Sequence, residues 1–302
     1  MDPPSSPPPT GRRQAPPWVD ELILRPGPPW RSMGIRTLDL NDWLVIDDRF
    51  RAEVDLKGDL LVERPDEVFA ARPAAAKASI EVLELILAWL AIHHPDLVTA
   101  TDSSCQSRHP LDRAGRLVSE DLCLMVPVGD TYLLEAASLC FPSHWRLHDK
   151  LGRSLAAIHA PVPHYSEELE AKVDLFFRRL HIDRPVQRRN LSIHSHDTLF
   201  SPGPFESPAS FAPDAAGIDQ VWLRSERQTL VRLPRTGAVL FTIKTQLCPA
   251  SDLASRPDVA GALAASLRAE EADLSDRGDR VPFPPWLPDW LERAVDPTAS
   301  HR

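Results

Sequence analysis

The chain has 302 residues, 43% of them hydrophobic, and a formal net charge of −9. This length allows one large domain or two small ones with a sizeable core. The negative charge argues against a general affinity for nucleic acid. No run approaches the ~18 apolar residues of a membrane-spanning helix. The N-terminal stretch MDPPSSPPPTGRRQAPPW lacks the apolar region of a secretory signal, so we expect a cytoplasmic protein that binds no membrane.

The chain contains four cysteines, and none of them belongs to a C-x-x-C pair. This spacing argues against a zinc knuckle or a thioredoxin-like redox site. Because no export signal is seen, we expect Cys105, Cys123, Cys140 and Cys248 to be reduced thiols.

Composition divides the chain into four parts. Residues 1–17 are rich in proline and are expected to be disordered. Residues 18–110 form a predicted N-terminal helical segment. Its strongest element is AAAKASIEVLELILAWLAIHH, which has an apolar stripe at helical spacing and ends before Pro95. Residues 111–250 form a central domain, and residues 251–302 form a charged, helical C-terminal tail.

The central domain changes its hydrophobic period several times. LVSEDLCLMVPV and TYLLEAASLCFP flank a Gly-Asp pair and predict a β-hairpin. LHDKLGRSLAAIHA and SEELEAKVDLFFRRLHI predict helices, and PVQRRNLSIHSH, VWLRSERQTLVRLP and GAVLFTIKTQLCP predict three strands. Two strands, a helical crossover and three strands are the plan of a PAS-like domain. The predicted fold class is therefore α+β, a PAS-like antiparallel sheet with helices over one face plus an N-terminal helical extension.

Common motifs for nucleotide binding, serine hydrolysis and zinc proteolysis are absent. The chain also has only 12 glycines, which disfavours a phosphate-cradling loop. Chemistry would therefore depend on scattered polar groups or on a bound cofactor.

His159 stands where a helical run meets two prolines, in AAIHAPVPHY. Pro161 and Pro163 fix φ and push the residues before them to extended conformations, so this segment is stiff. A stiff segment with one imidazole suits a metal ligand, which must be held in orientation. The alternative is a structural role in which His159 caps the helix carbonyls.

His194 lies in the predicted strand NLSIHSH. Alternation places Ser192, His194 and His196 on one face and the apolar Leu191 and Ile193 on the other. The histidines then face solvent or a pocket above the sheet, and their i, i+2 spacing can bring two imidazoles to one metal. An exposed polar strand face is the alternative.

The strand RSERQTLVRLP is the third candidate. Arg224, Glu226 and Gln228 alternate with Arg227, so charged groups lie on both faces. Burying charges is costly unless they are paired, so the strand is either exposed or lines a polar pocket. Glu226 among arginines would ionise readily and can bind an ammonium group or relay a proton. A surface ladder of ion pairs is the alternative.

Several strings together resemble one family. They are WRSMGIRTLDLNDWL, HPLDRAGRLVSEDLCLM, LCFPSHWRLHDKLGRSLAAIHAPVPHY, VDLFFRRL and RSERQTLVRLPRTGAVLFTIKT. In this order they resemble the haem-dependent oxidative N-demethylase family over residues 30–249. The resemblance implies a PAS-like fold with b-type haem and its iron in a pocket between helices and sheet.

The same resemblance implies a monooxygenase subunit. It would remove a methyl group from a small methylated amine, such as dimethylamine, with O2 and release formaldehyde. Electrons would come from NADPH through a separate reductase subunit with FMN and a 2Fe-2S cluster. This chain lacks a dinucleotide motif and a cysteine set for such a cluster. A folate-binding subunit is a further candidate partner.

Haem requires a proximal ligand, usually His or Cys. The matching segments offer His159, the favoured axial ligand, and His194, the alternative. The family's NWSIH appears here as NLSIH, with Leu191 in place of tryptophan, so the packing of this strand differs from the family pattern.

The remaining site residues follow from what haem chemistry would need. Glu226 would supply the charge for a protonated amine, and Arg224 a donor to a propionate or to O2. Arg227 and Gln228 are expected to contact propionates, and Tyr165 to line the pocket. Two other functions stay open: a non-catalytic haem-binding PAS-like sensor or gas-binding protein, and a haem-free paralogue serving as a binding subunit.

Overall fold

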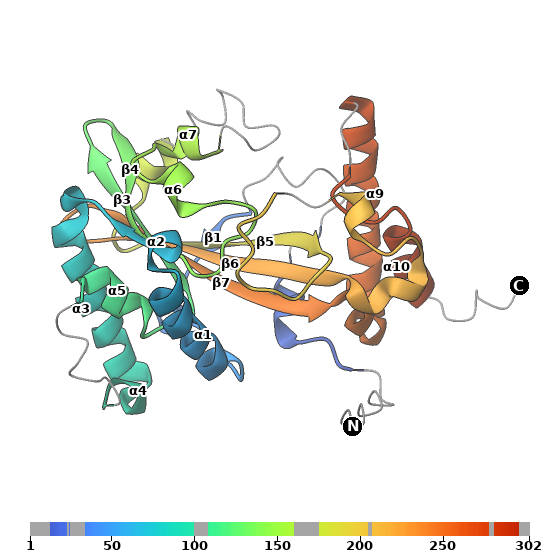
Figure 1. Ribbon diagram of the computed structural model, residues 1–302, viewed down its shortest axis with the longest axis horizontal. Coiled ribbons are helices and arrows are strands. Elements are labelled where there is room, and N and C mark those ends of the chain that lie inside the picture. The colour runs from blue at the N-terminus through green and yellow to red at the C-terminus, as the bar shows by residue number, and fades with distance from the viewer. Residues whose placement is uncertain are drawn as a thin grey trace, which may run out of the picture.

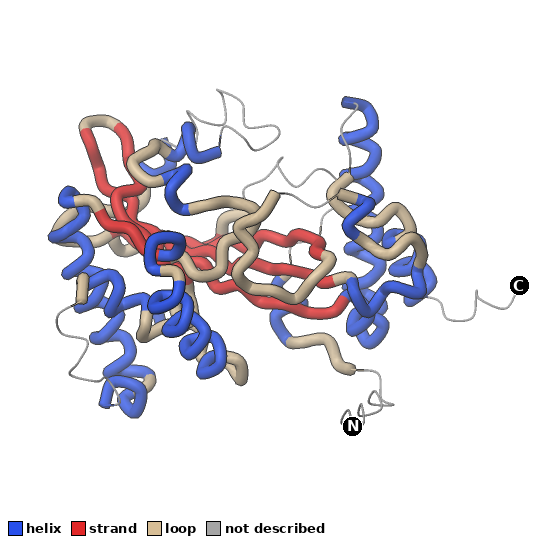
Figure 2. The backbone as a smooth tube through the Cα atoms, viewed as in Figure 1, coloured by secondary structure: helices blue, strands red, loops and turns tan. Residues whose placement is uncertain are grey.

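The computed structural model describes residues 13–22, 24, 34–99, 108–159, 175–204, 207–277 and 281–295. Its centre is a seven-stranded antiparallel sheet in the order β1-β5-β6-β7-β3-β4-β2, drawn as one layer in Figure 2. The strands are β1 (Arg36–Thr37), β2 (Phe69–Ala71), β3 (Asp121–Val128), β4 (Thr131–Ser138), β5 (Val186–His194), β6 (Trp222–Arg232) and β7 (Val239–Pro249).

Helices lie on both sides of this sheet (Figure 1). On the first side are α1 (Phe50–Glu63), α3 (Ala76–His93), α4 (Pro95–Thr99) and α5 (Pro110–Gly115), with α2 (Pro65–Val68) following α1. On the second side are α6 (Leu147–Lys150) and α7 (Leu155–His159). Residues 175–179 are also helical. Near one end of the sheet are α9 (Pro257–Arg277) and α10 (Leu287–Val295).

The α+β class is confirmed; α6 and α7 lie over one face of the sheet, and helices of the N-terminal part cover the other. Leu122, Leu124 and Leu240 belong to a buried cluster with residues of α3 and α5. Their strand neighbours Cys123 and Met125 point the other way and belong to a second cluster, with residues of α6 and α7. The strand sequences are apolar on both faces here, so each face must be covered.

The predicted hairpin is confirmed, with Gly129 at φ +59° in its turn between β3 and β4. The helical pattern of residues 147–158 is instead interrupted between α6 and α7. Gly152, at φ +76°, donates its N–H to Leu134 O at 2.7 Å, and Leu134 N donates to Arg153 O at 3.0 Å. These bonds to β4 replace the helical ones.

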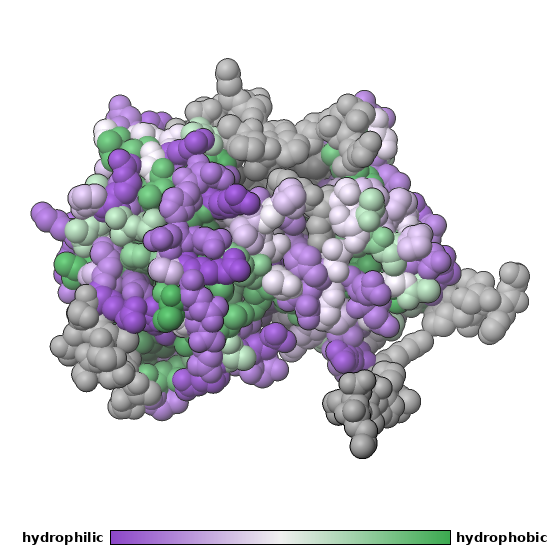
Figure 3. Space-filling view, in the orientation of Figure 1, coloured by the Kyte–Doolittle hydropathy of each residue, from purple (hydrophilic) through white to green (hydrophobic). Residues whose placement is uncertain are grey.

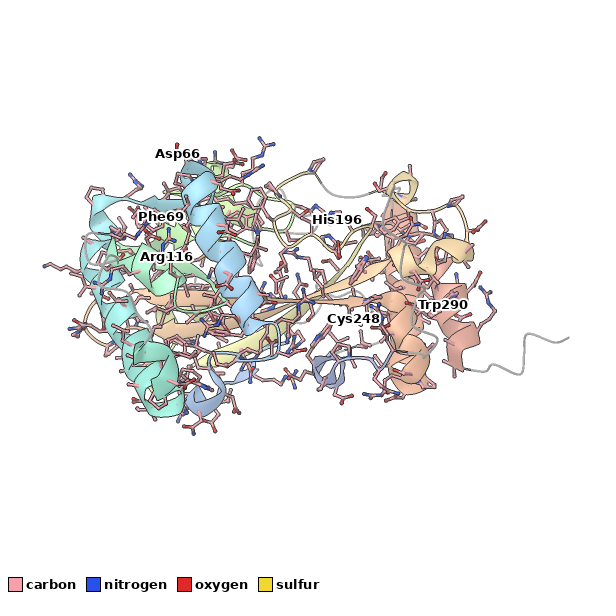
Figure 4. The ribbon with its side chains drawn as sticks, turned by 60° about the horizontal axis from the view of Figure 1, so that its bottom comes forward. Asp66, Phe69, Arg116, His196, Cys248 and Trp290 are labelled. Carbon is pink, nitrogen blue, oxygen red and sulfur yellow. The ribbon has the colours of Figure 1, made fainter. Side chains whose placement is uncertain are left out.

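Both ends of the described chain meet in a separate buried cluster. It joins Trp18 and Val19 of the 3-10 turn Pro17–Glu21 to Leu287 and Leu291 of α10, with apolar residues of α9 and of β5, β6 and β7 between them. Figure 4 labels Trp290 on α10 and Cys248 on β7, at this end of the sheet. This cluster ties the C-terminal helices to the sheet.

A buried ionic layer connects α1 to the first face of the sheet. Lys244 of β7 donates to Glu53 of α1 and to Ser119 Oγ at 3.0 Å. Lys57 Nζ donates to Val118 O at 2.9 Å. Outside this layer, hydrophilic and hydrophobic side chains are intermixed on the face that carries α1 and α2 (Figure 3).

Candidate functional site

The second face of the sheet changes from apolar to polar towards β5. Directly opposed residues of antiparallel strands share a face. The register pairs Asn190 with Glu226, Ser192 with Arg224, and Glu226 with Thr245. Alternation along the strands extends this polar face, which comprises Arg188, Asn190, Ser192 and His194 of β5, Arg224, Glu226 and Gln228 of β6, and Thr245 of β7.

Four buried side-chain atoms on this polar face have no hydrogen-bond partner among the described residues. They are Arg188 Nε, His194 Nδ1, Arg224 Nε and Thr245 Oγ1. Buried polar atoms in folded proteins are nearly always hydrogen-bonded. Because these four come from three adjacent strands and point to one side, the face suits a polar ligand with several acceptors.

Arg224 is fully buried and binds main-chain oxygens of two loops. Its Nη2 donates to Phe141 O at 2.7 Å and Pro142 O at 3.3 Å, and its Nη1 to Leu199 O at 3.1 Å and Thr198 O at 3.3 Å. Its two terminal nitrogens are therefore occupied. Only Nε faces the polar surface, 3.8 Å from Glu226 Oε1.

The loop after β4 has a second anchor. Both carboxylate oxygens of buried Asp121 accept main-chain hydrogen bonds, from Cys140 N at 2.7 Å and from Phe141 N at 2.9 Å. Burial raises the pKa of Asp121 to about 6. Arg224 and Asp121 thus bind the same three-residue stretch, 140–142, through its carbonyl and N–H groups respectively.

Glu226 lies beside Arg224 and Gln228 on the polar face. Gln228 Nε2 donates to Glu226 Oε2 at 3.0 Å. The side chain of Glu226 retains 13% exposure, whereas that of Arg224 has none. This carboxylate is therefore held in orientation by its neighbours while part of it remains accessible.

His194 is fully buried among other histidines. Its ring stacks on His144 at a centroid distance of 4.7 Å and meets His196 edge-on at 5.5 Å; Figure 4 labels His196 after β5. His194 Nε2 lies 3.0 Å from Ser192 Oγ. Burial, then the charge of Arg224, lower the pKa of His194 to about 3, so the ring is neutral. His144 adopts φ +60°, unusual for a non-glycine residue.

Of the other predicted site residues, the structure places one, Arg227, apart from this group. Arg227 lies on the opposite face of β6, where it donates to Trp43 O at 2.9 Å and to Gln187 Oε1 at 3.0 Å. His159 is the last residue of α7, on the same side of the sheet as the polar face. The structure does not describe its side chain. Tyr165 lies outside the described residues.

Arg188 is the site residue that the sequence reading missed. It is half-buried on the polar face, next to Asn190 along β5 and opposite Gln228. The sequence pattern could have indicated it: side chains of a strand alternate between faces, so the face of Ser192 and His194 also carries Arg188, four residues before Ser192.

Three described cysteines, Cys123, Cys140 and Cys248, are unpaired and buried. Burial raises the pKa of each thiol, to about 12 for Cys140 and Cys248. These side chains therefore stay protonated and are poor thiolate ligands. Within the described ranges, no three His, Cys, Asp or Glu side chains are grouped so that they could hold a bare metal ion.

None of the described helices combines the length and apolar character needed to cross a membrane. A family model described as haem-dependent oxidative N-demethylase, alpha subunit-like, matches residues 34–277. The matched range contains all seven strands and the polar face.

Proposed function

The chain belongs to the haem-dependent oxidative N-demethylase, alpha subunit-like family, and on that premise we propose that it binds b-type haem against the polar face. The observation that carries the proposal is the set of four buried polar atoms without partners among the described residues. Leaving a buried donor without a hydrogen bond is costly, and one large ligand with carboxylate groups could accept hydrogen bonds from several of these atoms at once.

The connectivity supports a PAS-like assignment for residues 111–250. The β3–β4 hairpin is followed by the segment with α6 and α7 and then by β5, β6 and β7. β3 pairs with both β4 and β7, so the first strand of this domain is central and next to the last. Helices on the second side and the polar face would then enclose the ligand between them.

We favour His159 as the axial ligand and keep His194 as the alternative. Thiolate ligation is disfavoured by the raised pKa of the described cysteines. His194 is packed between His144 and His196, and its Nε2 is within hydrogen-bond distance of Ser192. Iron ligation there would require that packing to open, whereas His159 ends a short helix on the same side.

When bound, haem would supply the activation of O2. The N-methyl amine, O2, two electrons and two protons give the demethylated amine, formaldehyde and water. The chain's own contribution is binding and orientation. Glu226 would bind the ammonium group of a small methylated amine through its accessible carboxylate. Gln228 orients that carboxylate, and Arg224 holds the two neighbouring loops in place.

Electrons would come from NADPH through another subunit that carries FMN and a 2Fe-2S cluster. The words "alpha subunit-like" in the family description fit a multi-subunit assembly. The sequence has no dinucleotide-binding motif, and the three described cysteines are buried apart from one another in different clusters. A folate-binding subunit would be a suitable acceptor for the formaldehyde.

The test begins with the purified wild-type chain and ferric haem b. We expect a stoichiometric Soret band, and formaldehyde from dimethylamine when NADPH, a surrogate ferredoxin reductase, ferredoxin and O2 are added. A folded protein without a Soret band would refute haem binding. A Soret band without formaldehyde from any small methylated amine would favour the sensor.

The ligand assignment is tested by His159→Ala and His194→Ala in parallel. We expect His159→Ala to change the Soret and ligand-field bands and His194→Ala to leave them in place. The opposite pattern would assign the iron to His194.

A further inference from the structure

Arg188 carries a charge that the described protein does not neutralise by contact. Its side chain is half-buried, and its Nε is fully buried. Among the described residues it has neither a hydrogen bond nor an ion pair, whereas the neighbouring Arg189 bonds to Glu21, Ser225 and Gln246. Burying part of a guanidinium without a partner costs free energy. We therefore expect Arg188 to bind a group that offsets this cost.

The carboxylate of Glu226 is already in contact with residues other than Arg188. Glu226 lies nearest to Arg224, 3.8 Å from its Nε, and its second oxygen accepts from Gln228. Glu226 also attracts Arg188 at longer range but makes no ion pair with it, so the guanidinium of Arg188 is not neutralised by direct contact with a described residue.

We propose that Arg188 anchors a carboxylate of the ligand bound on the polar face. A guanidinium presents parallel N–H donors that match the two oxygens of a carboxylate. The identity of the ligand rests on the proposed function, which offers two sources of this group: a haem propionate, or a methylated amine that itself bears a carboxylate. In both cases the anion would supply the contact partner that Arg188 lacks among the described residues.

The position of Arg188 suits an anchor at the entrance of the site. Asn190, the next residue along β5 on this face, is exposed, whereas Arg224 and His194 further along are buried. β1 pairs only with residues before Arg188, so among the described residues β5 forms the edge of the sheet beyond that point. A carboxylate held here would lie near solvent while the rest of the ligand extends over β6 and β7.

The test compares Arg188→Met with wild type and with Arg51→Met, which removes an exposed arginine from α1. Haem-free protein is titrated with haem b and with its dimethyl ester, in which both propionates are blocked, and the Soret band is recorded. Haem-loaded protein is then titrated with N-methylglycine and with dimethylamine, and the spectral shift is recorded.

If the carboxylate is a propionate, Arg188→Met should weaken haem b binding at least tenfold and leave ester binding unchanged. If it belongs to the substrate, the variant should lose N-methylglycine binding at least tenfold and keep dimethylamine binding. The proposal is overturned if all four affinities match those of Arg51→Met, or if haem b and ester weaken equally. Should Arg188→Met fail to fold, Arg188→Lys is titrated instead, with a smaller selective loss expected because its ammonium lacks the bidentate fork.

Failure of the proposed function has a different signature. Wild-type protein would then bind neither haem b nor its ester. In that case, calorimetric titration of the haem-free proteins with N-methylglycine decides: binding by wild type that is lost in Arg188→Met upholds the carboxylate anchor, and absence of binding by wild type overturns it.

Discussion

Replacing Arg224 by methionine should destabilise the whole protein as well as the site. The change leaves four main-chain oxygens, of residues 141, 142, 198 and 199, without their donor. The two shorter bonds, at 2.7 and 3.1 Å, are the main contributors. A hydrogen bond from a charged donor contributes about 1.5–3 kcal/mol, which gives about 3–6 kcal/mol for the pair. Relief from burying the guanidinium offsets part of this, so we expect a net loss of about 3–4 kcal/mol.

Urea unfolding followed by tryptophan fluorescence measures this loss, with Arg51→Met as a control expected to change stability by less than about 0.5 kcal/mol. Hydrogen exchange tests the local effect. His144 N donates to Ser201 O at 2.8 Å, and Ser201 N to Pro142 O at 3.2 Å, so both amides should lose protection when the loops separate. Arg224→Met stability within about 1 kcal/mol of wild type, with both amides still protected, would refute the positioning role.

Three further predictions concern carboxylates. Glu226→Gln should raise the KM for a methylated amine at least tenfold and leave the Soret band of the haem-loaded protein unchanged; an unaltered KM would remove Glu226 from amine binding. For Asp121, the folded pKa of about 6 lies above the ordinary 3.8, so the folded state retains a proton that the unfolded state loses, and stability falls as pH rises through this interval. Relative to Asp121→Asn, wild type should lose about 2 kcal/mol of unfolding free energy between pH 4 and 7, and parallel pH profiles would contradict this. Lys244→Met leaves buried Glu53 with the exposed Arg49, 3.7 Å away, as its remaining cation among the described residues, and should cost about 3–5 kcal/mol; the double variant with Glu53→Leu should recover much of this if the cost comes from the weakly paired charge.

Local patterns in the sequence were sufficient for much of the fold. Alternation assigned the residues of β5 and β6 to their faces, and the Gly-Asp pair located the hairpin. These signals depend on the period of a strand and on the φ preference of glycine, which are properties of neighbouring residues. The helical spacing of residues 147–158 was misleading, because Gly152 and Arg153 bond to β4, a partner that helical periodicity does not reveal.

The candidate site shows the same division. The sequence alone indicated the family, the histidine candidates and the polar face that joins Arg224, Glu226 and Gln228. Only the tertiary structure decided that Arg224 is occupied by carbonyls of two distant loops and that Arg227 bonds to Trp43 on the opposite face. It also decided that Arg188 has no such partner in the part of the chain that the structure describes. The reason is that backbone geometry determines which way a strand side chain points, whereas its bonding depends on groups that the fold brings in from elsewhere in the chain.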